Sequence, residues 1–397
     1  MRSRLRAESR PRARVHDGAI ELVRVRRTER RVGGSPMTAL RILLTGTGTI
    51  GRELLVPLLR ASSNRVAVLM RDRRRRSAQQ RADALFRELD LTASERARVE
   101  VLQGDVTCAG LGLDAAAQVR IIEDVDLIIH TAAATALTAD RALCDAVNRA
   151  GTANVLGLAE RCYTRGRLKR LVHLSTALVA GGGSATLACE DELPATPAHA
   201  NHYEWSKYEA ERIVRAAMHA GLPVTVFRPS MVVGETETGR TRDFNVIYPL
   251  MRIMASGYVT RFPADPRARI HLAPLDFVVG AIMRSLDAAW TVGLTFHLTA
   301  PDPPTVAQLF DCDAFFPSGV SRPQLYPPAE FDPSACTPRE RDLLESVSFC
   351  FPYFNSRLSF ETRNAGRLVP LPVTDSAYLT RLGRYAVESG YLQRTAG

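Results

Sequence analysis

The feature that most constrains the fold is a repeated alternation of short apolar runs with amphipathic helical segments between residues 40 and 235. The apolar runs are nearly continuous, which is typical of strands buried on both faces of a sheet. We expect strands at 41–46, 65–71, 99–106, 125–133, 171–180 and 223–230, and helices at 50–60, 78–89, 140–163 and 203–220. This repetition predicts an α/β protein with a doubly wound parallel sheet.

The regular pattern ends near residue 235. Prolines and aromatic residues become frequent after it, in stretches such as PDPPT, FPSG and SFCFPYF. We therefore expect three parts: a disordered basic extension (1–37), a main domain (38–235), and a smaller irregular substrate-binding region (236–397) with some segments that return to the sheet.

The net charge of +10 is unevenly distributed. Residues 1–36 hold eleven arginines and four acids, so seven of the ten net positive charges lie there. This segment is either an arm for nucleic acid or an anionic surface, or a disordered extension translated from a start upstream of Met37. The second interpretation is favoured, and no nucleic-acid partner is expected.

The composition argues against a membrane-spanning protein and against a metal-binding protein. No apolar run approaches the ~18 residues of a membrane span, and the extension has no apolar core of a secretory signal. The seven cysteines show no C-x-x-C pair and no metal-ligand spacing with histidine. We expect reduced thiols, no bound metal and a cytoplasmic location.

A glycine-rich segment follows the first strand. LTGTGTIG (44–51) contains G-x-G-x-x-G as Gly46, Gly48 and Gly51, with Thr47, Thr49 and Ile50 between them. Glycines in this place let the backbone turn sharply toward a pyrophosphate, while the next helix N-terminus supplies amide donors. Because the motif lies between a strand and a helix, it predicts dinucleotide binding.

The ends of the next two strands indicate which dinucleotide binds. Arg71 ends the run VLMRDRRRR, where an acid would favour NAD and an arginine accommodates the 2′-phosphate of NADPH. Asp105, followed by Val106, ends the third strand and is a candidate partner for the adenine amino group. The sequence predicts NADPH, although the arginine run also fits a solvated loop.

A tyrosine and a lysine lie one helical turn apart in HYEWSKYEAE (202–211). Only two of the 52 basic residues are lysines, so Lys207 stands out four residues after Tyr203. A phenol exchanges protons poorly near neutral pH, and a nearby ammonium stabilises its phenolate. Ser175 and Thr176 end a strand at the same edge of the sheet, where ligands bind. A strand alternates faces, so only one of these two hydroxyls points into the crevice.

Taken together, TGTGTIG, GDV, HTAA, the Ser-Thr strand end, Y-x-x-x-K and FRPS resemble the extended short-chain dehydrogenase/reductases, a Rossmann-fold family. HLSTALVAG, GDVTCAGLGL, FRPSMVVGETETG, PLDFVVGAI and PYFNSRLSFETRN further resemble its thioester-reductase and fatty acyl-CoA reductase (male sterility) branch. Members of that branch usually carry G-x-x-G-x-x-G. This chain has one residue fewer between the first two glycines, which implies a tighter turn.

The resemblance implies a role for each matching residue. Thr176 would hold the substrate carbonyl, with Ser175 as the alternative; Tyr203 would donate a proton, and Lys207 would tune it and hold the nicotinamide ribose. The remaining implied cofactor contacts are Ala132 and Ala133 of HTAA, and Pro229 and Ser230 beside the nicotinamide. The Phe-acid-x-x-Asn element in FETRN would close the substrate region.

The leading functional prediction is an NADPH-dependent reductase of an acyl thioester carried by CoA or an acyl carrier protein. An aldehyde, or after a second reduction an alcohol, would be the product. The first alternative is a ketone or alcohol dehydrogenase, or a nucleotide-sugar epimerase or dehydratase, of the same superfamily. The second is a non-catalytic dinucleotide-binding regulator, since a fold does not guarantee activity.

Overall fold

The computed structural model describes residues 39–182, 186–245, 247–316 and 319–392, together with the backbone of 11–16 and 19–24. The two N-terminal segments are strands, β1 (Pro11–His16) and β2 (Ala19–Arg24), paired antiparallel. The rest of the extension expected at 1–37 lies outside the described residues.

The centre of the protein is a seven-stranded sheet in the order β13-β9-β7-β6-β3-β4-β5, with every neighbouring pair parallel. Its strands are β3 (Arg41–Thr45), β4 (Arg65–Met70), β5 (Val99–Gln103), β6 (Leu127–His130), β7 (Arg170–Leu174), β9 (Val224–Pro229) and β13 (Thr295–Leu298). The first six correspond to the six strands expected from the sequence. The predicted doubly wound α/β fold is confirmed.

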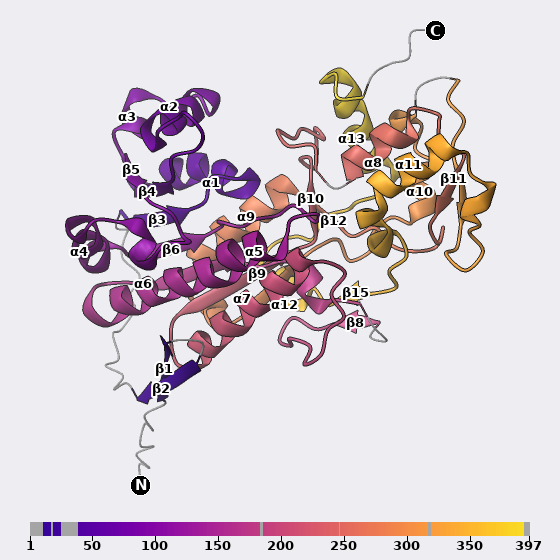
Figure 1. The fold of residues 1–397 in the computed structure, drawn as a ribbon. Helices are drawn as coiled ribbons and strands as arrows, with labels where there is room; N and C mark the ends of the chain where they lie inside the picture. Colours follow the sequence, from indigo (N-terminus) through magenta and orange to yellow (C-terminus); the bar gives the residue numbers. More distant parts are fainter. Residues whose placement is uncertain are drawn as a thin grey trace.

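Helices cover both faces of this sheet (Figure 1). Alternate residues of β3 show why: Ile42 and Leu44 belong to one buried cluster, and Leu43 belongs to another on the opposite face. The first cluster packs under α1 (Thr49–Arg60), α2 (Ala78–Glu88), α9 (Leu275–Leu286) and α12 (Arg363–Leu368); the second lies under α4 (Ala115–Asp124), α6 (Gly151–Arg165) and α7 (His202–His219). Continuous apolar strands therefore reflect burial on both sides.

The helix expected at 140–163 is helical over 141–165 but contains a wider turn. It consists of α5 (Arg141–Cys144), a π-helical segment η2 (Asp145–Ala150) and α6. Short π segments are rare and often occur at functional sites. The remaining short elements on this side are α3 (Ala93–Arg96), η1 (Ala109–Gly112), η3 (Ala177–Ala180) and η4 (Ala289–Thr291).

The later part of the chain forms a separate group of helices around its own core, seen in orange and yellow in Figure 1. Its helices are α8 (Ile247–Met254), α10 (Val306–Phe310), α11 (Pro338–Ser346), α13 (Ser376–Glu388), η5 (Asp313–Phe315), η6 (Pro333–Ala335) and η7 (Ser348–Phe354). Its two-stranded pairs are β10 (Met231–Val233) with β12 (Leu272–Pro274), and β11 (Arg261–Pro263) with β14 (Gln324–Tyr326). We call this group the C-terminal region.

Three later elements nevertheless belong to the main sheet layer: β13 pairs with β9, α9 packs against α1, and α12 lies beside β13. A third small pair, β8 (Leu187–Ala188) with β15 (Ser359–Phe360), connects the two halves of the chain. No helix among the described residues is long and apolar enough to cross a membrane.

Candidate active site

The glycine turn lies between β3 and α1, as its sequence predicts. Gly46 has φ +93°, and a side chain there would meet the backbone of Ala132 at 2.5 Å. A side chain on Gly51 would lie 2.1 Å from the Gly46 carbonyl oxygen. Gly48, the N-cap of α1, faces open space, and a Cβ at this position would have no neighbouring atom within 4 Å. The first and last glycines are therefore needed for packing, while the middle one leaves room beside the helix N-terminus.

Thr47, Thr49 and Ile50 complete this loop at the start of α1. The Thr49 hydroxyl donates to Asp243 at 2.6 Å, and the same carboxylate accepts from Arg52 at 2.6 Å. Asp243 belongs to the segment after β10, so this segment reaches the mouth of the glycine turn. Ala132 and Ala133 follow β6 on the other side of the turn.

Arg71 and Asp105 are neighbours at the ends of β4 and β5, with 3.2 Å between an Arg71 guanidinium nitrogen and an Asp105 carboxylate oxygen. Burial alone would raise the pKa of Asp105, but hydrogen bonds from Thr107 and the pairing with Arg71 together hold it below its ordinary value. The carboxylate is therefore charged near neutral pH. Val106, which follows it, is buried.

The residues after Arg71 form an exposed turn in which Arg73 and Arg76 exchange backbone hydrogen bonds of 3.0 and 3.1 Å. The side chains of Arg73, Arg74, Arg75 and Arg76 make no ion pair with any described residue. A group of exposed cations beside the end of β4 can neutralise a phosphate, which fits the predicted 2′-phosphate site.

Tyr203 and Lys207 lie on the first turns of α7, facing the ends of β7 and β9. The Lys207 ammonium is 2% exposed and donates to the carbonyl oxygen of Leu174, the last residue of β7, at 2.7 Å. Burial lowers the pKa of Lys207 to about 8, while the charge on Glu211 opposes that decrease. The lysine is thus poised to change charge slightly above neutral pH.

Burial raises the pKa of the Tyr203 phenol to about 12, and a hydrogen bond with Thr176 opposes this increase. Thr176 is 4% exposed and lies 3.4 Å from the carbonyl oxygen of Pro229. The structure therefore brings Thr176, Tyr203 and the end of β9 together. Ser230, which follows Pro229, is also buried, with its hydroxyl 3.5 Å from the Leu298 carbonyl oxygen.

The hydroxyl of Ser175, the alternative to Thr176, does not contact Tyr203. It donates to the Glu211 carboxylate at 2.6 Å. Neighbouring residues of an extended segment face opposite ways, so Thr176 and Ser175 serve different surroundings. Of the two, only Thr176 has a side-chain contact with Tyr203.

Glu211 is the centre of a buried ionic network that sequence reasoning missed. It is fully buried and pairs with Arg228 at 2.6 Å and with Arg215 at 2.8 Å. Burial alone would raise its pKa, but the two arginines outweigh this and hold it at about 2. A signal for it existed, because Tyr203, Lys207 and Glu211 recur at four-residue spacing on one helix face.

Asn148 was also missed. It lies in the π segment η2, is 1% exposed, and exchanges two hydrogen bonds with the backbone of Ala134 after β6. Its amide also donates to Ser206 of α7 at 2.8 Å. It therefore ties the loop after β6 to the helix that carries Tyr203 and Lys207. Nothing in the apolar periodicity of a helix marks a π turn or the asparagine in it.

The FETRN element lies against the sheet edge formed by β13. Phe360 packs edge-on against His271 and His297, and Glu361 accepts from the backbone of Glu190 at 3.0 Å. Asn364 donates to the Thr295 carbonyl oxygen at 3.0 Å. These contacts connect the segment after β8 to β13.

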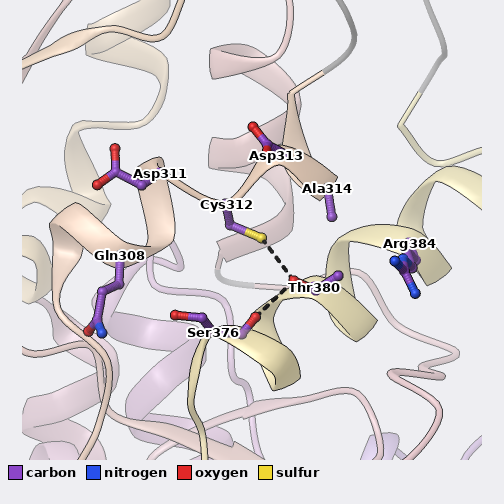
Figure 2. A pocket seen from close by; sticks show the side chains of 8 residues that line it. All are labelled: Gln308, Asp311, Cys312, Asp313, Ala314, Ser376, Thr380 and Arg384. Carbon is purple, nitrogen blue, oxygen red and sulfur yellow. Dashed lines mark hydrogen bonds between the residues drawn. The ribbon is translucent and has the colours of Figure 1, made fainter.

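A pocket of about 660 Å³ lies in the C-terminal region and shares no residue with the predicted site. Figure 2 shows it between α13, which supplies Ser376, Thr380 and Arg384, and the α10–η5 segment. Cys312 and Thr380 are in contact across it at 3.9 Å. Among the described residues, no three His, Cys, Asp or Glu side chains gather into a group that could hold a metal ion.

This arrangement suits hydride chemistry on a nicotinamide cofactor. The glycine turn leaves space at a helix N-terminus for a pyrophosphate, and the exposed arginines follow the end of the neighbouring strand β4. Lys207 uses one of its three donors on the Leu174 carbonyl oxygen, which leaves two donors without a hydrogen bond to a described residue. Thr176 and Tyr203 offer two hydroxyls to one carbonyl oxygen.

Comparison with known proteins also indicates a protein that binds a nicotinamide cofactor. Residues 44–282 match the model of an NAD-binding family described as male sterility protein. The chain is 27% identical over 293 residues to the fatty acyl-CoA reductase wat of Drosophila melanogaster, covering 65% of this chain and 55% of that protein. It is 32% identical over 271 residues to a carboxylic acid reductase of Segniliparus rugosus, covering 61% of this chain and 22% of that protein. The chain thus spans between about a fifth and about half of these relatives.

Among solved structures, the terminal R domain of the myxalamid PKS-NRPS pathway superposes with a TM-score of 0.76 at 25% identity, over 91% of this chain and 94% of that one. An NAD complex of UDP-glucuronic acid 4-epimerase from Bacillus cereus reaches 0.62 at 18% identity, over 89% and 100%. The second likeness shows the shared fold alone.

Proposed function

Because the chain belongs to the male sterility family of NAD-binding proteins, whose model covers residues 44–282, we propose that it is an NADPH-dependent reductase of acyl thioesters. The observation that carries the proposal is the contact of Tyr203 with Thr176 at the ends of β7 and β9, with Lys207 donating to Leu174 at the end of β7. Relatives named as a fatty acyl-CoA reductase, a carboxylic acid reductase and a thiolation-reductase di-domain support a thioester carried by CoA or a carrier protein.

In this mechanism Thr176 and Tyr203 bind the thioester carbonyl oxygen. A bound NADPH supplies the hydride that reaches the carbonyl carbon. Negative charge then develops on the oxygen, and the two hydroxyls stabilise it most strongly in the transition state. Tyr203 transfers its proton to that oxygen, and the resulting hemithioacetal loses the thiol to leave an aldehyde.

Lys207 makes this proton transfer feasible. The phenol has a high pKa of about 12, so losing a proton leaves a costly phenolate. An ammonium one helical turn away stabilises that phenolate. Glu211 helps to keep Lys207 protonated, because its charge raises the lysine pKa.

The preference for NADPH over NADH rests on the arginines at the end of β4. Arg71 lies there with four exposed arginines after it, and the acid that would favour NADH at that strand end is Asp72, one residue later. Asp72 accepts a hydrogen bond from the backbone of Ala78 at 2.8 Å, which engages it at the start of α2. This supports a 2′-phosphate site over a ribose 2′-hydroxyl site.

The test is cofactor oxidation by purified protein with a panel of acyl-CoA thioesters, the matching aldehydes and cyclic ketones, each with NADPH and NADH. Thioester-dependent oxidation should fall about 100-fold or more in Tyr203→Phe, since general acid catalysis contributes roughly that much. Tyr258→Phe is the matched control, because Tyr258 is half exposed in the C-terminal region.

Other outcomes identify the alternatives. Oxidation with ketones but no thioester would place the protein among the ketone or alcohol dehydrogenases of the superfamily. Cofactor binding without turnover on any substrate would indicate a non-catalytic regulator. A second reduction step would appear as oxidation with the aldehydes alone.

A further inference from the structure

One side chain from the C-terminal region reaches the first turn of α7. Asn201 caps this helix, and its side-chain oxygen accepts from the Glu204 amide at 3.0 Å. The Tyr353 hydroxyl accepts from the Asn201 side-chain amide at 2.7 Å and donates to the Glu204 carboxylate. The second carboxylate oxygen accepts from the Ala200 amide at 2.8 Å. Tyr353 thus closes a ring of hydrogen bonds beside Tyr203.

The two residues that follow Tyr353 are fixed within the C-terminal region. The next residue, Phe354, is fully buried and packs edge-on against Phe262 and Phe310, with ring centroids 5.9 and 6.4 Å away. Asn355 then accepts from the Asp265 amide at 2.8 Å and donates to the Pro263 carbonyl oxygen at 3.1 Å. The tyrosine therefore moves with the core of the C-terminal region, while its hydroxyl is bonded to the catalytic helix.

The contact also places a buried acid next to the proton donor. Glu204 is 3% exposed, and burial raises its pKa, against which the hydrogen bond from Tyr353 acts most strongly. A charged Glu204 in turn raises the pKa of Tyr203. The other groups that act on the Tyr203 phenol are Cys144 from α5 and Thr176 after β7, and Lys207 follows one turn along α7.

We propose that Tyr353 is a positioning residue for the reaction, which locks the first turn of α7 to the C-terminal region and thereby sets the orientation of Tyr203 and the charge beside it. The inference rests on the proposed function for its kinetic readout. It gives the C-terminal region a direct influence on the proton donor: an acyl chain that shifts η7 would also shift the turn that carries Tyr203.

The experiment compares Tyr353→Phe with wild type in the full chain. The variant keeps the ring and removes only the hydroxyl, so packing should persist. Loss of one hydrogen bond to a charged group should lower kcat/KM for the thioester about tenfold. The inflection of the pH–rate profile that comes from Glu204 should move to higher pH, because the Tyr353 hydroxyl that holds the pKa of this carboxyl down is gone. Amides 202–206 should exchange hydrogen faster.

Two further variants separate the contributions. Glu204→Gln keeps an acceptor for the Tyr353 hydroxyl and removes the charge at every pH, so the inflection from Glu204 should disappear, with less effect on hydrogen exchange. Tyr326→Phe is the control, since its hydroxyl donates to Gln324 on the same short strand, far from α7 in the fold. It should match wild type in all three readouts.

The proposal is overturned if Tyr353→Phe retains wild-type kcat/KM, pH profile and exchange of amides 202–206, even when its Tm falls. That result would mean a purely structural tyrosine. If wild type itself turns over no thioester, the proposed function fails on its own, and the exchange measurement still decides whether Tyr353 holds the first turn of α7.

Discussion

The main sheet and the C-terminal region bury their cores in different ways. In the sheet, parallel strands alternate side chains between two apolar clusters, so each strand is buried on both faces. The C-terminal region has only short two-stranded pairs among its described residues, and aromatic contacts such as Phe262 with Phe354 hold its helices together. Backbone hydrogen bonds between strands connect most elements of the first region, while side-chain contacts connect most elements of the second.

This difference explains how each region serves the site. Parallel strands end at one edge, so the sheet brings the glycine turn, Thr176 and Pro229 together through its backbone. The C-terminal region reaches the same site through individual side chains, Tyr353 above all. Changes in the first region should therefore affect cofactor binding and chemistry together, and changes in the second should spare the cofactor.

The largest expected effect is on the buried ionic network of the first region. Glu211→Gln leaves Arg228 buried with its main partner neutralised, which should cost about 3–5 kcal/mol of unfolding free energy. Denaturant unfolding measures it. Glu209→Gln is the control, because Glu209 pairs with the exposed Arg212 and such surface pairs contribute about 0.2–1 kcal/mol. Equal losses in the two variants would refute a special role for the network.

The next prediction concerns pH. The pKa of Lys207 is lowered to about 8, so its ammonium is present below that pH and is lost as the pH rises through it. Activity should fall about tenfold per pH unit well above the midpoint if the ammonium is required. A pH–rate profile in saturating cofactor tests this. An activity that stays level to about pH 10, well past this pKa, would show that the charge of Lys207 is not needed.

A comparable effect is expected on cofactor choice. Arg71→Ala should raise the KM for NADPH about tenfold by removing one charged contact to the 2′-phosphate, and should leave the KM for NADH unchanged. Initial-rate kinetics with both cofactors measure the ratio. Arg87→Ala, at an exposed position late in α2, is the control. A parallel rise for both cofactors would remove Arg71 from the 2′-phosphate site.

The smallest effect should come from the aromatic core of the C-terminal region. Phe354→Leu roughly conserves volume and should cost about 1 kcal/mol of unfolding free energy. NADPH binding, followed by fluorescence of the bound cofactor, should be unchanged, since the dinucleotide site belongs to the sheet. Weaker NADPH binding would show that the two regions are coupled more tightly than their separate cores indicate.

Much of the main domain was determined by the sequence itself. Strands such as 41–46 and helices such as 203–220 follow from local periodicity, and the glycine motif together with Tyr203 and Lys207 needs only nearby residues to be recognised. Parallel topology then places the strand ends at a single edge. The fold class and the contact between Thr176 and Tyr203 could therefore be predicted, because both depend on short-range patterns and a general rule of sheets.

Other features depended on residues far apart in the chain. The different surroundings of Thr176 and Ser175 depend on Glu211, which accepts the hydrogen bond of the serine hydroxyl. The pairing of Arg71 with Asp105 joins two strand ends, and Tyr353 meets Glu204 across 149 positions. No local pattern encodes such contacts, because long-range packing decides which buried polar groups find each other. The sequence determined the helix that carries Tyr203 and Lys207, and only the tertiary structure decided what holds its first turn.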